Sequence, residues 1–292
     1  MSRLLLIDGS NLARRNFHGQ SLATFSGIRT GCIYGSIASL LMITGLYPAE
    51  KVVVVWDAPG GSTFRKELYP AYKGGRAVPD PDYIEDSGNL KQLLQAMGVC
   101  QIEQEGAEAD DIIGYLAHEF NDEVIIVSND KDFYQLISQR IRVWSPHNQE
   151  FVPVVNGKVP IKEGAKTIWL YPSQVPDYKA MAGDKSDNIP GAVGFGIGAA
   201  ITFFESNANI DCLLEGKGNI TQLRSSSALA LMRAIPVLAM FKKVATINDE
   251  AGRVEIPVRP PVHKDLVQGL FEHYEFKQFM AMGERVYSIG GK

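Results

Sequence analysis

The sequence lacks the residues that several large classes of protein need. Only three of its 292 residues are cysteine and five are histidine, and the cysteines are far apart. This excludes a disulfide framework and a metal site built from closely spaced Cys and His. No apolar run reaches the roughly 18 residues of a membrane span, and the N-terminus lacks the features of a secretory signal. We therefore expect a protein of the reducing cytoplasm.

Positive charge is also scarce. Lys and Arg total 29 against 33 Asp and Glu, which gives a formal net charge of −4. Taken alone, this balance argues against a protein that binds nucleic acid. The argument fails if many carboxylates gather in one place and are neutralised by bound metal. The positions of the acids in the fold therefore decide whether the net charge excludes a protein that binds nucleic acid.

Short apolar runs alternate with amphipathic segments in the first half of the chain. The runs that predict strands are 4–7, 52–56, 99–102, 124–127 and 141–144. Helical spacing of apolar residues lies between them, and one such helix is expected to begin at Ser87 and stop at Gly98. This alternation predicts an α/β core with a mostly parallel central sheet flanked by helices. We expect the core to span residues 1–170.

Two parts of the chain depart from that alternation. Residues 60–86 form an insertion about twice as long as an ordinary connection, so they are either a functional lid or a disordered loop. After about residue 170 the pattern becomes helical, and a glycine-rich turn precedes one of the helices. We expect a second, helical region over 171–292, with its longest helical pattern interrupted near Pro236.

Carboxylates follow three of the predicted strands directly. Asp8 follows the strand at 4–7, Asp57 follows the strand at 52–56, and Asp130 and Asp132 follow the strand at 124–127. Parallel strands open on the same edge of a sheet, which is where ligand sites of such folds lie. Asp130 and Asp132 repel one another, and a divalent cation held between them would offset that repulsion.

Two further acidic groups lie outside the strand ends. Glu108, Asp110 and Asp111 open a predicted helix, where one acid would suffice to complement the free N–H groups. Asp184 and Asp187 lie in a turn, which is common and means little by itself. Nine carboxylates facing one cleft would have raised pKa values or bind cations. Oxygen ligands favour Mg²⁺ or Mn²⁺, and so many can serve two ions roughly 3.5–4 Å apart.

Six sequence blocks together make the chain similar to a known family. They are LLLIDGSNLARRNFHG, VVWDAPGGSTFRKELYPAYKGGR, GAEADDIIGYLA, VSNDKDFYQL, MAGDKSDNIPGAVGFGIG and LFEHYEFKQF. In content and order they resemble the 5′-nucleases, the superfamily of flap endonucleases and 5′→3′ exonucleases. The likeness is greatest to the nuclease domain of bacterial DNA polymerase I and to its free-standing phage relatives.

The resemblance implies a PIN-like 5′-nuclease fold in which all nine acids form the metal site. The implied ligands are Asp8, Asp57, Glu108 and Asp110 for a first Mg²⁺, Asp130, Asp132, Asp184 and Asp187 for a second, and Asp111 between them in an outer shell. Mn²⁺ can substitute. The implied reaction is two-metal hydrolysis of branched, nicked or 5′-ended DNA, which leaves a 5′-phosphate. One ion would activate a water, and the other would stabilise the leaving 3′-oxygen.

The resemblance also assigns roles to the basic insertion, which matches the family's helical arch. Lys73 and Arg76 would stabilise the transition state electrostatically, although a solvated surface run is the alternative. Arg15 and Arg65 would contact the DNA backbone. Tyr72 would either stack on a base or merely pack the arch.

The glycine series resembles a helix-hairpin-helix motif. Gly191, Gly194 and Gly196 would let backbone N–H groups approach a phosphate, and the family binds K⁺ there through carbonyls. A plain turn is the alternative. Relatives commonly carry Lys or Arg just after these glycines, whereas this chain has Ile-Gly-Ala-Ala over 197–200. Binding of a duplex would therefore depend on backbone amides and on Lys242 and Lys243.

Three functions stay open from the sequence. The leading one is a Mg²⁺-dependent structure-specific 5′ nuclease of a bacterial or phage-infected cytoplasm. It would act on DNA or RNA-primer 5′ ends, and it is expected to be free-standing beside a separate DNA polymerase. A catalytically inactive DNA-junction-binding relative would lack some of the acids, and none is missing. The basic, aromatic insertion and the glycine turn argue against a small-molecule phosphohydrolase.

Overall fold

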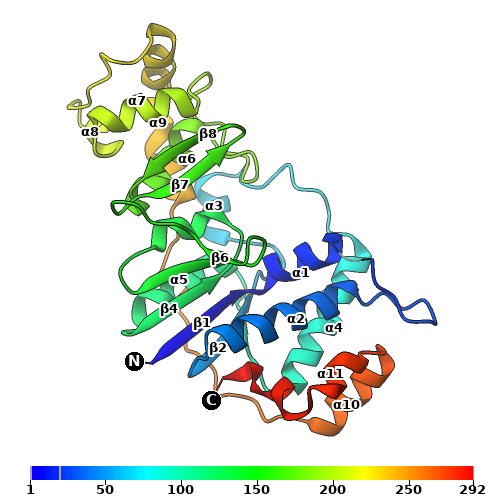
Figure 1. Ribbon diagram of the computed structural model, residues 1–292. Coiled ribbons are helices and arrows are strands. Elements are labelled where there is room, and N and C mark those ends of the chain that lie inside the picture. The colour runs from blue at the N-terminus through cyan, green and yellow to red at the C-terminus, as the bar shows by residue number, and fades with distance from the viewer. Residues whose placement is uncertain (1, 20, 292) are drawn as a thin grey trace.

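A six-stranded sheet forms the centre of the first half of the protein, as the computed structural model shows for residues 2–19 and 21–291 (Figure 1). Its strands are β1 (Arg3–Asp8), β2 (Lys51–Trp56), β3 (Cys100–Glu103), β4 (Glu123–Val127), β5 (Ile141–Ser145) and β6 (Glu150–Phe151). They follow the order β3-β2-β1-β4-β5-β6, and all are parallel except β6. The predicted mostly parallel sheet is confirmed.

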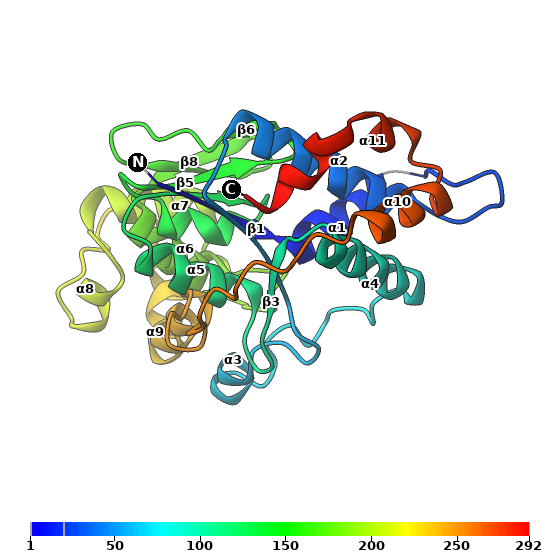
Figure 2. The same ribbon diagram turned by 90° about the horizontal axis from the view of Figure 1, so that it is seen from below.

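Both faces of this sheet are covered, which is why its strands are continuous apolar runs. Alternate residues of β1, β2 and β4 enter two separate cores. One core lies under α1 (Gly9–Gly19), α2 (Gly31–Leu46) and α4 (Pro81–Ala96), and the other under α5 (Ala109–Glu119). Figure 2 shows these helices on opposite sides of β1.

The helical region begins after a hairpin of β7 (Val159–Glu163) and β8 (Lys166–Leu170). Its elements are η2 (Pro172–Gln174), α6 (Val175–Ala182), α7 (Ile197–Ser206), α8 (Asp211–Leu214) and α9 (Ser225–Ala245). The expected interruption at Pro236 is wrong, because α9 continues through it. Pro236 is exposed, while buried residues such as Leu238 on the opposite side keep the helix packed in the core. None of the described helices is long and apolar enough to cross a membrane.

The C-terminal elements pack away from the helical region. They are α10 (Lys264–His273), α11 (Lys277–Ala281) and η3 (Gly283–Gly290). Their buried side chains, among them Val267 and Phe271, join the core formed by α2 and α4. The second region expected over 171–292 is therefore divided, because the buried side chains of the tail pack on α2 and α4. Figure 1 shows the tail beside these helices.

The insertion is less helical than an arch of helices would be. It contains α3 (Thr63–Leu68), then turns, and then residues 76–80, which have no regular secondary structure and lead into α4. The helix expected to start at Ser87 starts at Pro81 instead. Asp80 caps its N-terminus by accepting a hydrogen bond from the N–H of Asp82, and a proline suits the first helical turn.

Candidate metal and nucleic-acid site

The carboxyl ends of three parallel strands bring acids to one edge of the sheet, as the strand pattern predicted. Asp8 ends β1, Asp57 follows β2, and Asp130 follows β4. The Asp8 carboxylate accepts hydrogen bonds from the Asn11 N–H (2.9 Å) and the Ser128 hydroxyl (2.8 Å). Burial, and then the charge of Asp57, raise the pKa of Asp8 to about 8. These carboxyl groups therefore lie close enough to repel one another.

A first acidic group stands at the start of α5. It consists of Glu108, Asp110 and Asp111, whose nearest carboxylate oxygens all lie within 4.8 Å of one another. Asp57 joins this group to β2, because its carboxylate accepts a hydrogen bond from the Ala109 N–H at 3.0 Å. The end of one strand and the start of one helix thus hold the first group.

A second acidic group assembles from two distant parts of the chain. It consists of Asp132, Asp184 and Asp187, again with oxygens within 4.8 Å of one another. Asp132 lies in η1 (Lys131–Leu136), whose N-terminus is capped by Asp130. Asp184 and Asp187 lie in the turn after α6. The second group therefore exists only because the helical region packs against the α/β core.

The insertion connects the two acidic groups. The Tyr72 hydroxyl donates to Glu108 at 2.8 Å, and the Lys73 ammonium lies 2.6 Å from Glu108 and 4.0 Å from Asp187. The Arg76 guanidinium lies 3.2 Å from Asp187. Lys73 and Arg76 thus face the acids, and their effect on a transition state stays a prediction. Tyr72 is only 2% exposed, so it packs the insertion, and the expectation that it stacks on a base is wrong in this conformation.

Arg65 lies inside the protein. It is 1% exposed, and its guanidinium forms two bonds to Asp111 (2.6 and 2.8 Å) and one to Glu108 (3.0 Å). It also donates to the carbonyls of Val244 and Thr246 near the end of α9. The expected contact with a DNA backbone is therefore wrong, because packing turns this side chain inward to neutralise a buried acid.

Asp111 is fully buried, and its partners explain its role. Arg65 bonds to both carboxylate oxygens, and the Asn248 N–H donates to one of them at 2.8 Å. Burial, and then the neighbouring Asp110, raise the pKa of Asp111 to about 6 even though Arg65 opposes the shift. With both oxygens engaged, Asp111 holds structure around the site rather than facing the cleft.

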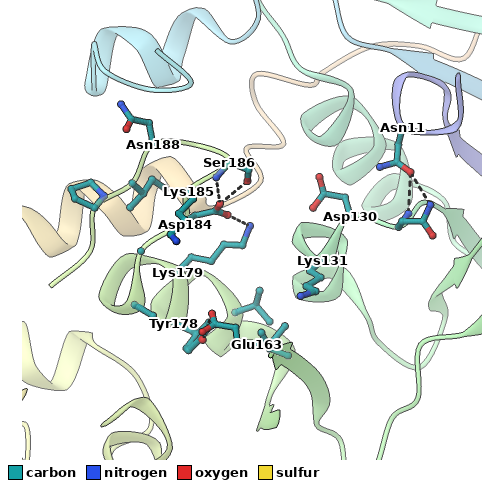
Figure 3. Close-up of a pocket in the computed structure, with 17 residues that line it drawn as sticks. Asn11, Asp130, Lys131, Glu163, Tyr178, Lys179, Asp184, Lys185, Ser186 and Asn188 are labelled. Carbon is teal, nitrogen blue, oxygen red and sulfur yellow. Dashed lines mark hydrogen bonds and ion pairs between the residues drawn. The ribbon is translucent and has the colours of Figure 1, made fainter. Parts of the chain in front are cut away.

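Lys179 is a site residue that the sequence reasoning missed. It projects from α6 into the second group, where its ammonium contacts Asp132. The same ammonium lies 2.7 Å from Asp184, as Figure 3 shows. Burial alone would raise the pKa of Asp184, but Lys179 and Ser186 outweigh it and lower the pKa to about 2. The available signal was one lysine within the otherwise apolar Tyr-Lys-Ala-Met-Ala, just ahead of a turn with two aspartates.

Two cavities flank the acids. One, of about 970 Å³, is lined by Asp130, Lys179 and Asp184 among others (Figure 3). The other, of about 1380 Å³, lies under the insertion and is lined by residues that include Arg14, Lys73 and Arg76. Arg15, expected to meet a phosphate, is half-buried and lines neither cavity. Its neighbour Arg14 points into the cleft, because residues next to each other on a helix face different directions.

The glycine-rich turn joins α6 to α7. Gly191 is buried at a φ of +64°, and a Cβ there would approach the backbone nitrogen of Gly183 to 2.4 Å. Its role is close packing of the turn, so its expected contact with a phosphate is wrong. Gly194 (φ +92°) and Gly196 are exposed, with nothing within 4 Å of where a Cβ would stand, so their contact with a phosphate stays a prediction.

Sequence models of known protein families match most of the chain. A sequence model described as "5'-3' exonuclease, N-terminal resolvase-like domain" matches residues 3–162, and one described as "5'-3' exonuclease, C-terminal SAM fold" matches residues 170–261. The thermostable DNA polymerase I of Thermus aquaticus is 32% identical over 284 residues, which cover 94% of this chain and 32% of the polymerase. The 5'-3' exonuclease of Aquifex aeolicus is 35% identical over 221 residues, which cover 74% of this chain and 73% of that protein.

The chain therefore spans about a third of the length of the polymerases that it matches. Its fold is similar to that of T5 5'-exonuclease with bound zinc, with a TM-score of 0.60, 20% identity, and coverage of 92% of this chain and 98% of the other. The catalytic core of Rad2 in complex with DNA shares it with a TM-score of 0.56, 12% identity, and coverage of 93% and 86%. Both halves of the sequence match models of one family, and the chain belongs to the 5'-3' exonuclease family.

Proposed function

We propose that this chain is a structure-specific 5′ nuclease that uses divalent metal ions to hydrolyse phosphodiesters near the 5′ ends of flapped or nicked DNA. One observation carries the proposal. Two groups of carboxylates, each spaced closely enough to hold a metal ion, are bridged by Lys73 in a protein of the 5'-3' exonuclease family.

The donor atoms fit Mg²⁺ or Mn²⁺. Both groups contain only carboxylates, and hard divalent ions prefer oxygen ligands. The proposed ligands are Asp8, Asp57, Glu108 and Asp110 at one position and Asp130, Asp132, Asp184 and Asp187 at the other. When bound, such ions would supply activation of the attacking water and stabilisation of the leaving 3′-oxygen. Asp111 would support the first position through its contacts with Arg65.

The protein's own cations would bring the substrate to this anionic cleft. Lys73 and Arg76 lie between the acids and the cavity under the insertion, where they would neutralise a phosphate and stabilise its developing charge. Arg14 lines the same cavity and would hold the strand further from the acids. The exposed amides near Gly194 and Gly196 would contact a duplex phosphate. Such binding would be sequence-independent and sensitive to salt.

The same proposal extends to partners that the family suggests. A K⁺ ion bound by backbone carbonyls would steady the turn between α6 and α7. An RNA primer with a 5′ end would compete with a DNA flap for the cleft, and a DNA polymerase would act on the same junction.

A cleavage-site map tests the proposal. The protein is incubated with 5′-flap, nicked and blunt duplexes and with an RNA-primed duplex, in Mg²⁺ or Mn²⁺, with EDTA as the control. We expect metal-dependent cleavage near the 5′ end that leaves a 5′-phosphate on the product. Tight junction binding without cleavage at any metal concentration would instead identify an inactive DNA-binding relative.

A further inference from the structure

Lys179 occupies the middle of the second acidic group. Its ammonium contacts Asp132 and lies 2.7 Å from Asp184. It therefore pairs with two of the four acids proposed for the second metal position. The ammonium thus forms ion pairs with two carboxylate oxygens that a metal ion would also need.

We propose that Lys179 is a built-in counter-ion of the second metal position, and that a divalent ion binds there by displacing its ammonium. This inference rests on the proposed function. An ammonium and a divalent ion at the same carboxylate oxygens repel one another and compete for the same lone pairs, so binding of the ion favours departure of the ammonium. Until then, Lys179 keeps Asp132 and Asp184 together against their mutual repulsion.

The side chain and its surroundings suit such an exchange. Lysine carries a compact charge on a flexible stem of four methylenes, so its ammonium can swing without moving the backbone. Lys179 also lines the cavity of about 970 Å³ beside the second group, which offers room for the displaced ammonium (Figure 3). Arg65 in the first group has neither property, because Asp111 and two carbonyls hold its buried guanidinium.

The opposite role would also be physically reasonable and makes the opposite prediction. If Lys179 stayed in place beside a bound ion and positioned the ligands, its removal would weaken metal binding. If it competes with the ion, its removal tightens metal binding and destabilises the metal-free protein. The direction of the change in affinity therefore decides between the two roles.

Calorimetric titration with Mn²⁺ in the absence of DNA makes this measurement on the full chain. We expect Lys179→Met to bind one Mn²⁺ about tenfold more tightly than the wild type, because the ammonium no longer competes with the ion for the carboxylates. Its melting temperature in EDTA should fall and then recover when Mn²⁺ is added. Lys179→Arg, which keeps the charge, should not show the tighter binding.

Lys131→Met is the matched control, because Lys131 lines the same cavity but donates to the carbonyl of Lys162 instead of to the acids. Equal tightening in Lys131→Met would show a general effect of charge and overturn the exchange. So would unchanged or weaker Mn²⁺ binding by Lys179→Met. If neither the wild type nor Lys179→Met binds Mn²⁺, the proposed metal chemistry is wrong as well. If both bind Mn²⁺ with equal affinity, only the proposed displacement of Lys179 is wrong.

A second measurement uses the wild-type protein, so it does not depend on whether a variant folds. In the unmodified protein with labelled lysine side chains, Mg²⁺ should shift the NMR signal of the Lys179 ε-methylene and leave that of Lys131 in place. A Lys179 signal that does not move at saturating Mg²⁺ would contradict the exchange.

Discussion

The two acidic groups differ in the cation that neutralises them. In the first group, Arg65 is buried and bonds to Asp111, Glu108 and two main-chain carbonyls. In the second, Lys179 reaches in from the side of an open cavity. A guanidinium fixed by several partners belongs to the core, whereas a single ammonium can leave. Two clusters with the same number of carboxylates can thus have different roles.

The two groups also differ in what holds them together. The first is local, because Glu108, Asp110 and Asp111 are near neighbours in sequence at the start of α5. The second joins η1 of the α/β core to the turn after α6. The first group should therefore persist as long as α5 is folded, and the second should respond to any change in the packing of the helical region.

The largest expected effect concerns an acid proposed for the second metal position. We expect Asp130→Ala to lower the cleavage rate on the order of 10³-fold, because it removes a proposed ligand of the second metal ion. We expect DNA binding to persist in this variant. A single-turnover assay on a 5′-flap duplex measures the rate. Asp265→Ala, an exposed acid on α10, is the control and should match the wild type. Comparable turnover by Asp130→Ala would remove this residue from the site.

Arg65 tests whether the first group is part of the core. Replacing it with Met leaves Asp111 as an unpaired buried charge, and we expect the free energy of unfolding to fall by about 3–5 kcal/mol. Urea denaturation in EDTA measures the loss, and the exposed neighbour Lys66, replaced in the same way, should change stability little. The contrast between the two groups would collapse if Lys179→Met destabilised the protein as much as Arg65→Met.

Lys73 contacts both acidic groups, so its replacement tests a residue that the two groups share. We expect Lys73→Ala to lower turnover on the order of 10²-fold with only a modest loss of DNA affinity, because its charge acts mainly on the transition state. Turnover and affinity are measured separately on the same flap substrate. An unchanged turnover rate would make Lys73 a simple counter-ion of Glu108.

Gly191 tests how far the second group depends on the turn that carries it. A Cβ at this position would collide with the backbone of Gly183, and the positive φ adds strain, so Gly191→Ala should cost about 1–3 kcal/mol of stability. Gly194→Ala is the matched control, because it has a similar φ but open space around it. Equal losses in the two variants would show that backbone strain, rather than close packing, makes the turn sensitive.

Some site residues were predictable because their positions follow from the chain direction alone. Asp8, Asp57 and Asp130 come after apolar strands, and the carboxyl ends of parallel strands must share one edge of the sheet. The direction of a side chain has no such rule. Arg65 was expected to contact the DNA backbone and points inward instead, because α3 packs against the end of α9.

The amino-acid pattern by itself determined the α/β alternation, the insertion and the acids that lie at strand ends. Only the tertiary structure decided which cation meets which acid. Arg65 and Asp111 are distant in sequence, as are Lys179 and Asp132, and packing alone brings each pair together. The reason is physical, because a buried charge is compensated by whatever lies within a few ångströms in space, and periodicity along the chain carries no record of that distance.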